Sequence, residues 1–122
     1  MKTFIIGILF TSVFFIGCKK NSIGGKSYLN GQVTHHGVAI PNAYIYIKYN
    51  STEFPGDDYN LYDTYIIADN NGNFNMNFFK GKYYIYARGY DLNINPPYIV
   101  KGGFSVTLRD REKISRNIAV TE

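Results

Sequence analysis

The sequence contains a single cysteine, no tryptophan and four prolines in 122 residues. One cysteine cannot form an intramolecular disulfide, so an exported domain of this size must rely on its hydrophobic core. The length also excludes a second ordinary domain, because about 100 to 150 residues is the usual size of one domain. We therefore expect one domain, together with any leader segment that precedes it.

Charged residues are scarce and scattered. They make up 18% of the chain with a formal net charge of +4, and Lys19 and Lys20 are the only adjacent cationic residues. Nucleic-acid binding requires a clustered basic face, so we expect no nucleic-acid partner. Hydrophobic residues make up 45% of the chain, which is typical of a folded domain rather than a disordered segment.

Long hydrophobic runs are absent apart from one near the start. A short cationic segment precedes an uncharged run at residues 4–16, and the small residue Gly17 then stands directly before Cys18. This order is typical of a secretory signal. A run from 4 to 16 has 13 residues. As a helix it would span about 20 Å, too short for a hydrocarbon core of about 30 Å, so it does not predict a retained transmembrane helix.

The end of this leader resembles a bacterial lipobox, in which the cysteine thiol is alkylated with diacylglycerol and the preceding peptide bond is cut. The residues that carry the resemblance are Phe15, Ile16, Gly17 and Cys18. Phe15 replaces the usual leucine but keeps its large apolar character. Two or three acyl chains, at about 0.8 kcal/mol per buried CH₂ group, would hold the protein on a membrane.

These features predict the organisation of the chain. Residues 1–17 are expected to be a lipoprotein signal peptide, residues 18–27 the lipidated Cys18 with a flexible tether, and residues 28–122 a folded domain. The expected location is the cell envelope. There the protein would be anchored to the outer membrane, on the periplasmic leaflet or at the cell surface.

The domain has the pattern of β-strands, because apolar residues recur with period two and no helical stripe is sustained. We expect seven short strands: one around residues 29–33, followed by 43–49, 62–68, 73–78, 83–88, 98–108 and 113–121. Asn71 and Gly72 predict a β-hairpin, because both residue types tolerate positive φ. Residues 50–61 predict a mobile surface loop. The predicted fold is an all-β, seven-stranded antiparallel β-sandwich.

Four segments carry a resemblance to a known family: residues 31–33 (GQV), 40–43 (IPNA), 68–74 (ADNNGNF) and 81–87 (GKYYIYA). Together they resemble the carboxypeptidase regulatory-like domain, a transthyretin-like (prealbumin-like) Greek-key sandwich of exported Bacteroidetes-type proteins. The resemblance covers residues 28–122. Ala68 and Lys80 depart from the usual residues of the family's turns. The resemblance implies an accessory or interaction module and brings no catalytic residues.

An aromatic cluster is the most informative candidate site. The resemblance implies that the second and fifth strands are neighbours in one sheet, so that several tyrosines and two cations share its outer face. These residues are Tyr44, Tyr46, Lys48, Tyr84, Tyr86 and Arg88, and Tyr62 and Tyr65 could extend the patch. Exposed phenols form a flat amphipathic surface suited to a sugar ring or a protein partner. The alternative is that the tyrosines only stabilise the sheet through cross-strand pairs.

Other polar clusters have simpler interpretations. His35 and His36 are adjacent, and neighbours in an extended segment point to opposite faces, so we expect an exposed turn rather than a metal site. Residues 69–73 begin like a calcium loop but lack the glycine and glutamate positions of an EF-hand. Glu53, Asp57 and Asp58 are expected to be solvated loop residues.

No serine lies in a nucleophile-elbow pattern, and we predict no catalytic residue, metal or cofactor. The sequence thus favours a non-enzymatic, membrane-anchored lipoprotein that binds a partner protein of the outer membrane or periplasm. The alternative is a carbohydrate-binding accessory lipoprotein that uses the exposed tyrosine face.

Overall fold

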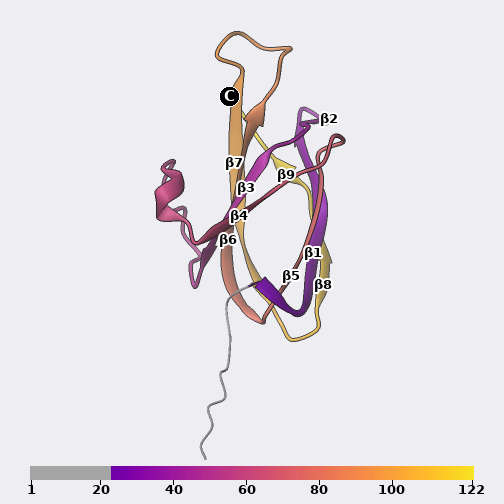
Figure 1. Cartoon of the computed structure of the whole chain (residues 1–122), viewed down its shortest axis with the longest axis vertical. Helices are drawn as coiled ribbons and strands as arrows, with labels where there is room; N and C mark the ends of the chain where they lie inside the picture. Colours follow the sequence, from indigo (N-terminus) through magenta and orange to yellow (C-terminus); the bar gives the residue numbers. More distant parts are fainter. Residues whose placement is uncertain (1–22) are drawn as a thin grey trace, which may run out of the picture.

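Alternating apolar and polar side chains build two facing β-sheets in residues 23–122, the part of the chain that the computed structural model describes (Figure 1). The first sheet has the order β2 (Val38–Ala39), β1 (Ile23–His35), β5 (Asn73–Phe78), and β8 (Lys113–Ser115) and β9 (Ile118–Ala119) pair in parallel with β1. The second has the order β4 (Thr64–Ile67), β3 (Tyr44–Tyr49), β6 (Gly81–Tyr90), β7 (Ile99–Leu108). The predicted all-β architecture is confirmed, and the two sheets are consistent with a β-sandwich. The expectation that all strands pair antiparallel is wrong, because β8 and β9 run parallel to β1.

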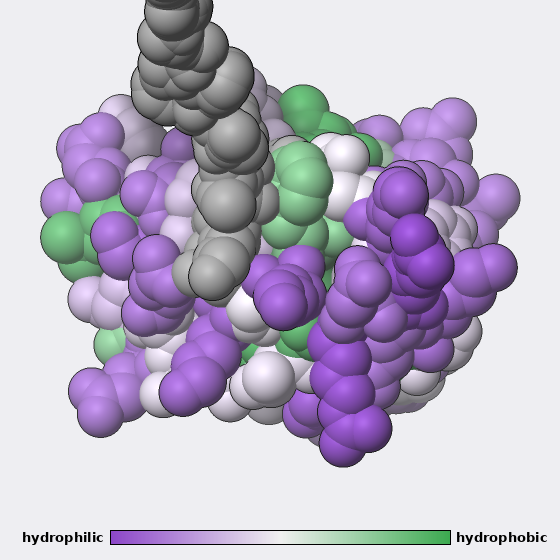
Figure 2. Space-filling view, turned by 90° about the horizontal axis from the view of Figure 1, so that it is seen from below, coloured by the Kyte–Doolittle hydropathy of each residue, from purple (hydrophilic) through white to green (hydrophobic). Residues whose placement is uncertain are grey.

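The hydrophobic core lies between the sheets, where alternate side chains of each strand point inward. Leu29, Val33 and Phe78 from the first sheet and Ile45 and Ile85 from the second are fully buried. Hydrophilic residues cover most of the surface seen from below, with hydrophobic residues visible in patches between them (Figure 2). The period-two pattern therefore predicted correctly which side chains of these strands face the core.

The first strand begins earlier than expected. β1 starts at Ile23, so residues 23–27 of the predicted tether belong to the sheet. A Cβ atom on Gly25 would lie 2.3 Å from the carbonyl oxygen of Phe78, so glycine here permits close strand packing rather than flexibility. Ser27 is buried, and its hydroxyl donates a hydrogen bond to the carbonyl oxygen of Arg109.

The turn at residues 69–72 forms, but it is not a β-hairpin. The Asp69 carboxylate accepts hydrogen bonds from the N–H groups of Asn71 and Asn73, at 2.8 and 2.9 Å, and Gly72 has φ +74°. However, β4 pairs with β3, whereas β5 pairs with β1. The hairpin prediction is wrong because each strand pairs with a more distant segment, so this turn carries the chain from one sheet to the other.

Short segments also alter the expected strand count. The predicted strand at residues 113–121 divides into β8, β9 and an isolated bridge between Lys101 and Thr121. The predicted turn after His36 contains the two-residue strand β2. A single turn of 3-10 helix, η1 (Tyr59–Leu61), lies in the long connection between β3 and β4. None of the helical segments in residues 23–122 is long and apolar enough to cross a membrane.

Candidate functional site

The strands that carry the predicted aromatic face are neighbours, as expected. β3 pairs antiparallel with β6, with Tyr44 opposite Arg88 and Tyr46 opposite Tyr86. β4 adds Tyr65 on the other side of Tyr46. Because opposite residues in a sheet share one face, these side chains stand together on the outer surface of the second sheet.

The expectation of four exposed phenols on a flat platform is wrong. Tyr86 is only 3% exposed, because the connection between β3 and β4 folds back over it. The Phe54 ring lies 5.2 Å from that of Tyr86, and the Tyr62 ring stacks on Tyr86 at 5.6 Å with an interplanar angle of 12°. These ring contacts remove the apolar surface of Tyr86 from water, while Phe54 itself stays 49% exposed.

One carboxylate holds this connection against the sheet. Asp57 accepts a hydrogen bond of 2.6 Å from the Tyr86 hydroxyl and one of 3.0 Å from the Lys101 ammonium. The Tyr86 hydrogen bond and then the Lys101 contacts lower the pKa of Asp57. Burial, reinforced by Asp57, raises the pKa of Tyr86. Asp57 is therefore exposed but paired, which corrects its expected role as a freely solvated charge.

The other two acidic residues of the connection differ in what they do. Asp58 caps η1, because its carboxylate accepts the N–H of Asn60 at 2.9 Å. Glu53 is exposed, and its backbone carbonyl accepts a hydrogen bond from the Ser51 hydroxyl at 2.9 Å. The connection expected to be a mobile loop thus has an ordered set of hydrogen bonds and ring contacts.

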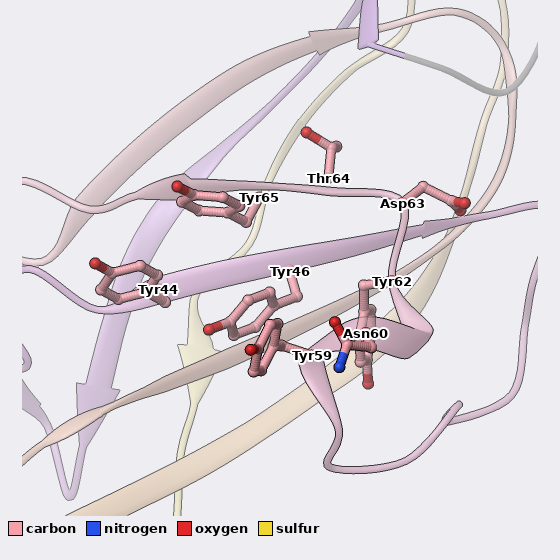
Figure 3. Close-up of a pocket in the computed structure, with 8 residues that line it drawn as sticks. All are labelled: Tyr44, Tyr46, Tyr59, Asn60, Tyr62, Asp63, Thr64 and Tyr65. Atoms are coloured by element: carbon pink, nitrogen blue, oxygen red, sulfur yellow. The ribbon is translucent and has the colours of Figure 1, made fainter.

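Beside this connection the tyrosines surround an open pocket of about 480 Å³, which we call the tyrosine groove (Figure 3). Its aromatic residues are Tyr44, Tyr46, Tyr59, Tyr62 and Tyr65, and Asn60, Asp63 and Thr64 complete the lining. Three of the tyrosines come from strands, and Tyr59 and Tyr62 come from η1 and the residue after it.

The rings of the tyrosine groove form a nearly continuous aromatic surface. The Tyr44 ring lies 5.5 Å from that of Tyr65 and 6.1 Å from that of Tyr46, both with interplanar angles of 25°. Tyr46 stacks in turn with Tyr59 at 6.4 Å. Asn60 also lines the groove, beside Tyr59 and Tyr62 in Figure 3, so an amide adds a polar group to the aromatic surface.

Burial keeps two of the groove phenols, Tyr46 and Tyr62, in the neutral form. Burial raises the pKa of Tyr46, an effect that the nearby Arg88 guanidinium partly offsets. Burial also raises the pKa of Tyr62, whose hydroxyl donates to the carbonyl oxygen of Gly56 at 2.8 Å. A neutral phenol offers both a donor and an acceptor to a ligand.

The remaining predicted residues take other positions. Lys48 faces the Asp63 carboxylate at 3.7 Å, and that carboxylate also accepts the N–H of Tyr49. Tyr84 packs against Phe54, with 5.8 Å between ring centroids, and lines a second hollow on the other side of the connection. Cys18, the predicted lipid attachment site, lies outside the described residues.

Sequence reasoning missed Tyr59, which lies in the connection rather than on a strand. A signal was present: residues 50–62 contain Phe54, Tyr59, Leu61 and Tyr62, an unusual number of large apolar residues for a solvated loop. Such a composition favours a segment that packs on the domain.

The histidine pair also differs from its prediction. His35 is only 3% exposed, and its Nδ1 lies 2.6 Å from Oδ2 of Asp91, so it is not part of an exposed turn. His36 is exposed but has φ +51°, a left-handed conformation that breaks the extended geometry. The two rings therefore lie together, with centroids 4.3 Å apart, instead of pointing to opposite faces.

Comparisons of this chain with models of protein families and with curated proteins found no match.

Proposed function

We propose that this chain is a non-enzymatic, lipid-anchored binding protein of the bacterial cell envelope whose tyrosine groove binds carbohydrate. The observation that carries the proposal is the grouping of five tyrosines around one open pocket, with Asn60 in its lining. Ligand sites commonly combine an aromatic lining with a few polar groups that fix orientation.

The chemistry of the groove suits a sugar. Aromatic faces carry partial negative charge, so they attract the weakly positive C–H bonds on the face of a pyranose ring. Tyr44, Tyr59 and Tyr65 are 43%, 63% and 53% exposed, so their rings are accessible for stacking. Their hydroxyl groups and the Asn60 amide would form hydrogen bonds with sugar hydroxyl groups, and tyrosine loses little conformational entropy when it binds a ligand.

The anchor and the finer fold belong to the same proposal. The lipobox-like sequence at Phe15–Ile16–Gly17–Cys18 supports lipid attachment at Cys18 and a location on the outer membrane. The two-sheet architecture and the pairing of β3 with β6 support a Greek-key sandwich of the transthyretin-like type. A lipid-anchored accessory protein with this groove would hold a glycan close to the membrane surface.

A glycan array followed by titration calorimetry tests the proposal on the full chain in mild detergent. We expect selective glycan binding that weakens at least about tenfold in Tyr44→Ala combined with Tyr65→Ala, because an aromatic anchor is typically worth more than about 1.4 kcal/mol. Tyr90→Ala is the matched control, since Tyr90 is 61% exposed and lies outside the groove.

Two outcomes would contradict glycan binding. One is the absence of binding to any glycan on the array. The other is equal binding by the double variant and the control variant, with thermal unfolding showing that both remain folded.

A protein partner is the second candidate function, and the edge of the second sheet favours it. β4 is the outer strand of that sheet, and its Tyr65 and Ile67 side chains are exposed beside it. An exposed strand edge can accept a strand from another protein, with side-chain contacts adding specificity. A photo-crosslinker placed at Ile67 in living cells should then capture one reproducible protein. Adducts no more frequent than those from a crosslinker at Tyr90 would contradict a partner at this edge.

A further inference from the structure

Three segments distant in sequence meet at one end of the sandwich, away from the tyrosine groove. They are the end of β1 with the turn that follows it, the loop between β6 and β7, and residues 121–122 beside β7 (Figure 1). The first contributes His35 and His36, the second Asp91, and the third Glu122. Antiparallel hydrogen bonds between Lys101 and Thr121, at 2.8 and 2.9 Å, position Glu122 at this end.

One potential ligand atom from each of His35, His36 and Glu122 lies within 4.8 Å of the others. Nε2 of His35 faces Oε2 of Glu122 at 3.5 Å, longer than an ordinary hydrogen bond. The left-handed backbone of His36 turns its ring toward His35. Two imidazoles and one carboxylate are a ligand set that zinc uses in proteins.

Asp91 supplies the contact that usually accompanies a metal-binding histidine. Its carboxylate is buried, accepts the N–H of Asn93 at 2.9 Å, and lies 2.6 Å from Nδ1 of His35. A proton held on Nδ1 by Asp91 leaves the Nε2 lone pair free on the side of Glu122. Such a carboxylate orients the ring and increases the basicity of its metal-binding nitrogen.

We propose that His35, His36 and Glu122 bind a Zn²⁺ ion and that Asp91 orients His35 for this role. Asp91 and Glu122 together carry the two negative charges that balance the ion. A tetrahedral ion with bonds of about 2.0 to 2.1 Å needs ligand atoms closer together than 4.8 Å, and the exposed side chains of His36 and Glu122 are free to move inward. Three protein ligands leave the fourth position for water or an additional ligand.

Metal titration of the full chain in mild detergent tests this site. The measurement is made in a Cys18→Ser background, so that the thiol cannot bind zinc. We expect one Zn²⁺ per chain by calorimetry, a higher unfolding temperature with zinc, and an intense visible spectrum with Co²⁺, as for a tetrahedral site. Failure to bind close to one equivalent of Zn²⁺ would overturn the proposal.

Variants at the exposed positions separate a metal site from a merely structural His35–Asp91 pair. His36→Gln and Glu122→Gln should each weaken zinc binding at least about tenfold and leave the zinc-free unfolding temperature nearly unchanged. Asp91→Asn should weaken it by about 10- to 100-fold. Asp110→Asn is the matched control, because that carboxylate is exposed and follows the end of β7 at Leu108, whereas the cluster lies near the start of β7, where Lys101 pairs with Thr121. Zinc affinity equal to that of the control in the combined His36→Gln and Glu122→Gln variant would overturn the proposal.

Discussion

The hydroxyl of Tyr86 donates a 2.6 Å hydrogen bond to the carboxylate of Asp57, a residue 29 positions earlier in the chain. This bond joins the middle of β6 to the connection between β3 and β4. Because the same carboxylate also binds Lys101 of β7, the connection is held across two strands of the sheet. The shape of the tyrosine face therefore depends on Asp57. The connection that it holds covers Tyr86 and leaves the tyrosine groove open beside it.

Removal of the Asp57 carboxylate should release the connection. In Asp57→Ala, Tyr86 loses its acceptor and Lys101 its counter-ion, so we expect faster amide hydrogen exchange in residues 51–63 and greater solvent exposure of Tyr86. Exchange in β1 and β5, which lie in the other sheet, should change little. Exchange rates in residues 51–63 equal to those of Asp110→Ala, a change at an exposed carboxylate, would contradict this role of Asp57.

Acid should release the connection in the same way. The connection between β3 and β4 is docked when Asp57 binds Tyr86 and Lys101, and the pKa of Asp57 is lowered in this state. In the undocked state the carboxylate has an ordinary pKa of about 4. The undocked state therefore binds a proton more readily. Docking should be fully favoured above about pH 4 and lost as the pH falls through the lowered value. Near-ultraviolet circular dichroism of the tyrosines measures this transition, and the same transition in Asp57→Asn would show that another group causes it.

Core and surface isoleucines should respond differently to truncation. Ile85 is fully buried between the sheets, so Ile85→Ala should lower the free energy of unfolding by about 2 to 5 kcal/mol. Ile67 is 50% exposed on β4, so Ile67→Ala should cost less than about 1 kcal/mol. Denaturant unfolding of the two variants measures the difference. Similar losses would contradict the assignment of Ile85 to the core.

Lipid attachment at Cys18 can be checked by mass spectrometry of the native protein. We expect the protein isolated from membranes to lack residues 1–17 and to carry diacylglycerol on the Cys18 thiol. Cys18→Ser should abolish lipid incorporation and release any folded product from the membrane, whereas Lys19→Ser should not. A native protein with intact Met1 and an unmodified thiol would contradict the anchor.

Local sequence pattern was sufficient for much of the fold. Period-two alternation identified the inward sets of β3, β5 and β6, because side chains of successive strand residues point to opposite faces whatever the strand pairs with. The Asn71–Gly72 pair located the turn at residues 69–72, because glycine readily adopts a positive φ and Gly72 has φ +74°. The adjacency of β3 and β6 followed only from the family resemblance, because strand pairing depends on contacts distant in sequence.

The sequence by itself determined where the longer central strands lie and which of their side chains share a face, because both follow from backbone geometry over a few residues. It did not determine the start of β1, the short strand β2 or the division of residues 113–121 into β8 and β9. Only the tertiary structure decided that β4 and β5 belong to different sheets and that the connection with Phe54 and Tyr59 folds over the tyrosines. It also decided that the left-handed His36 turns its ring beside that of His35. Each of these depends on contacts or backbone conformations that local period-two alternation does not specify.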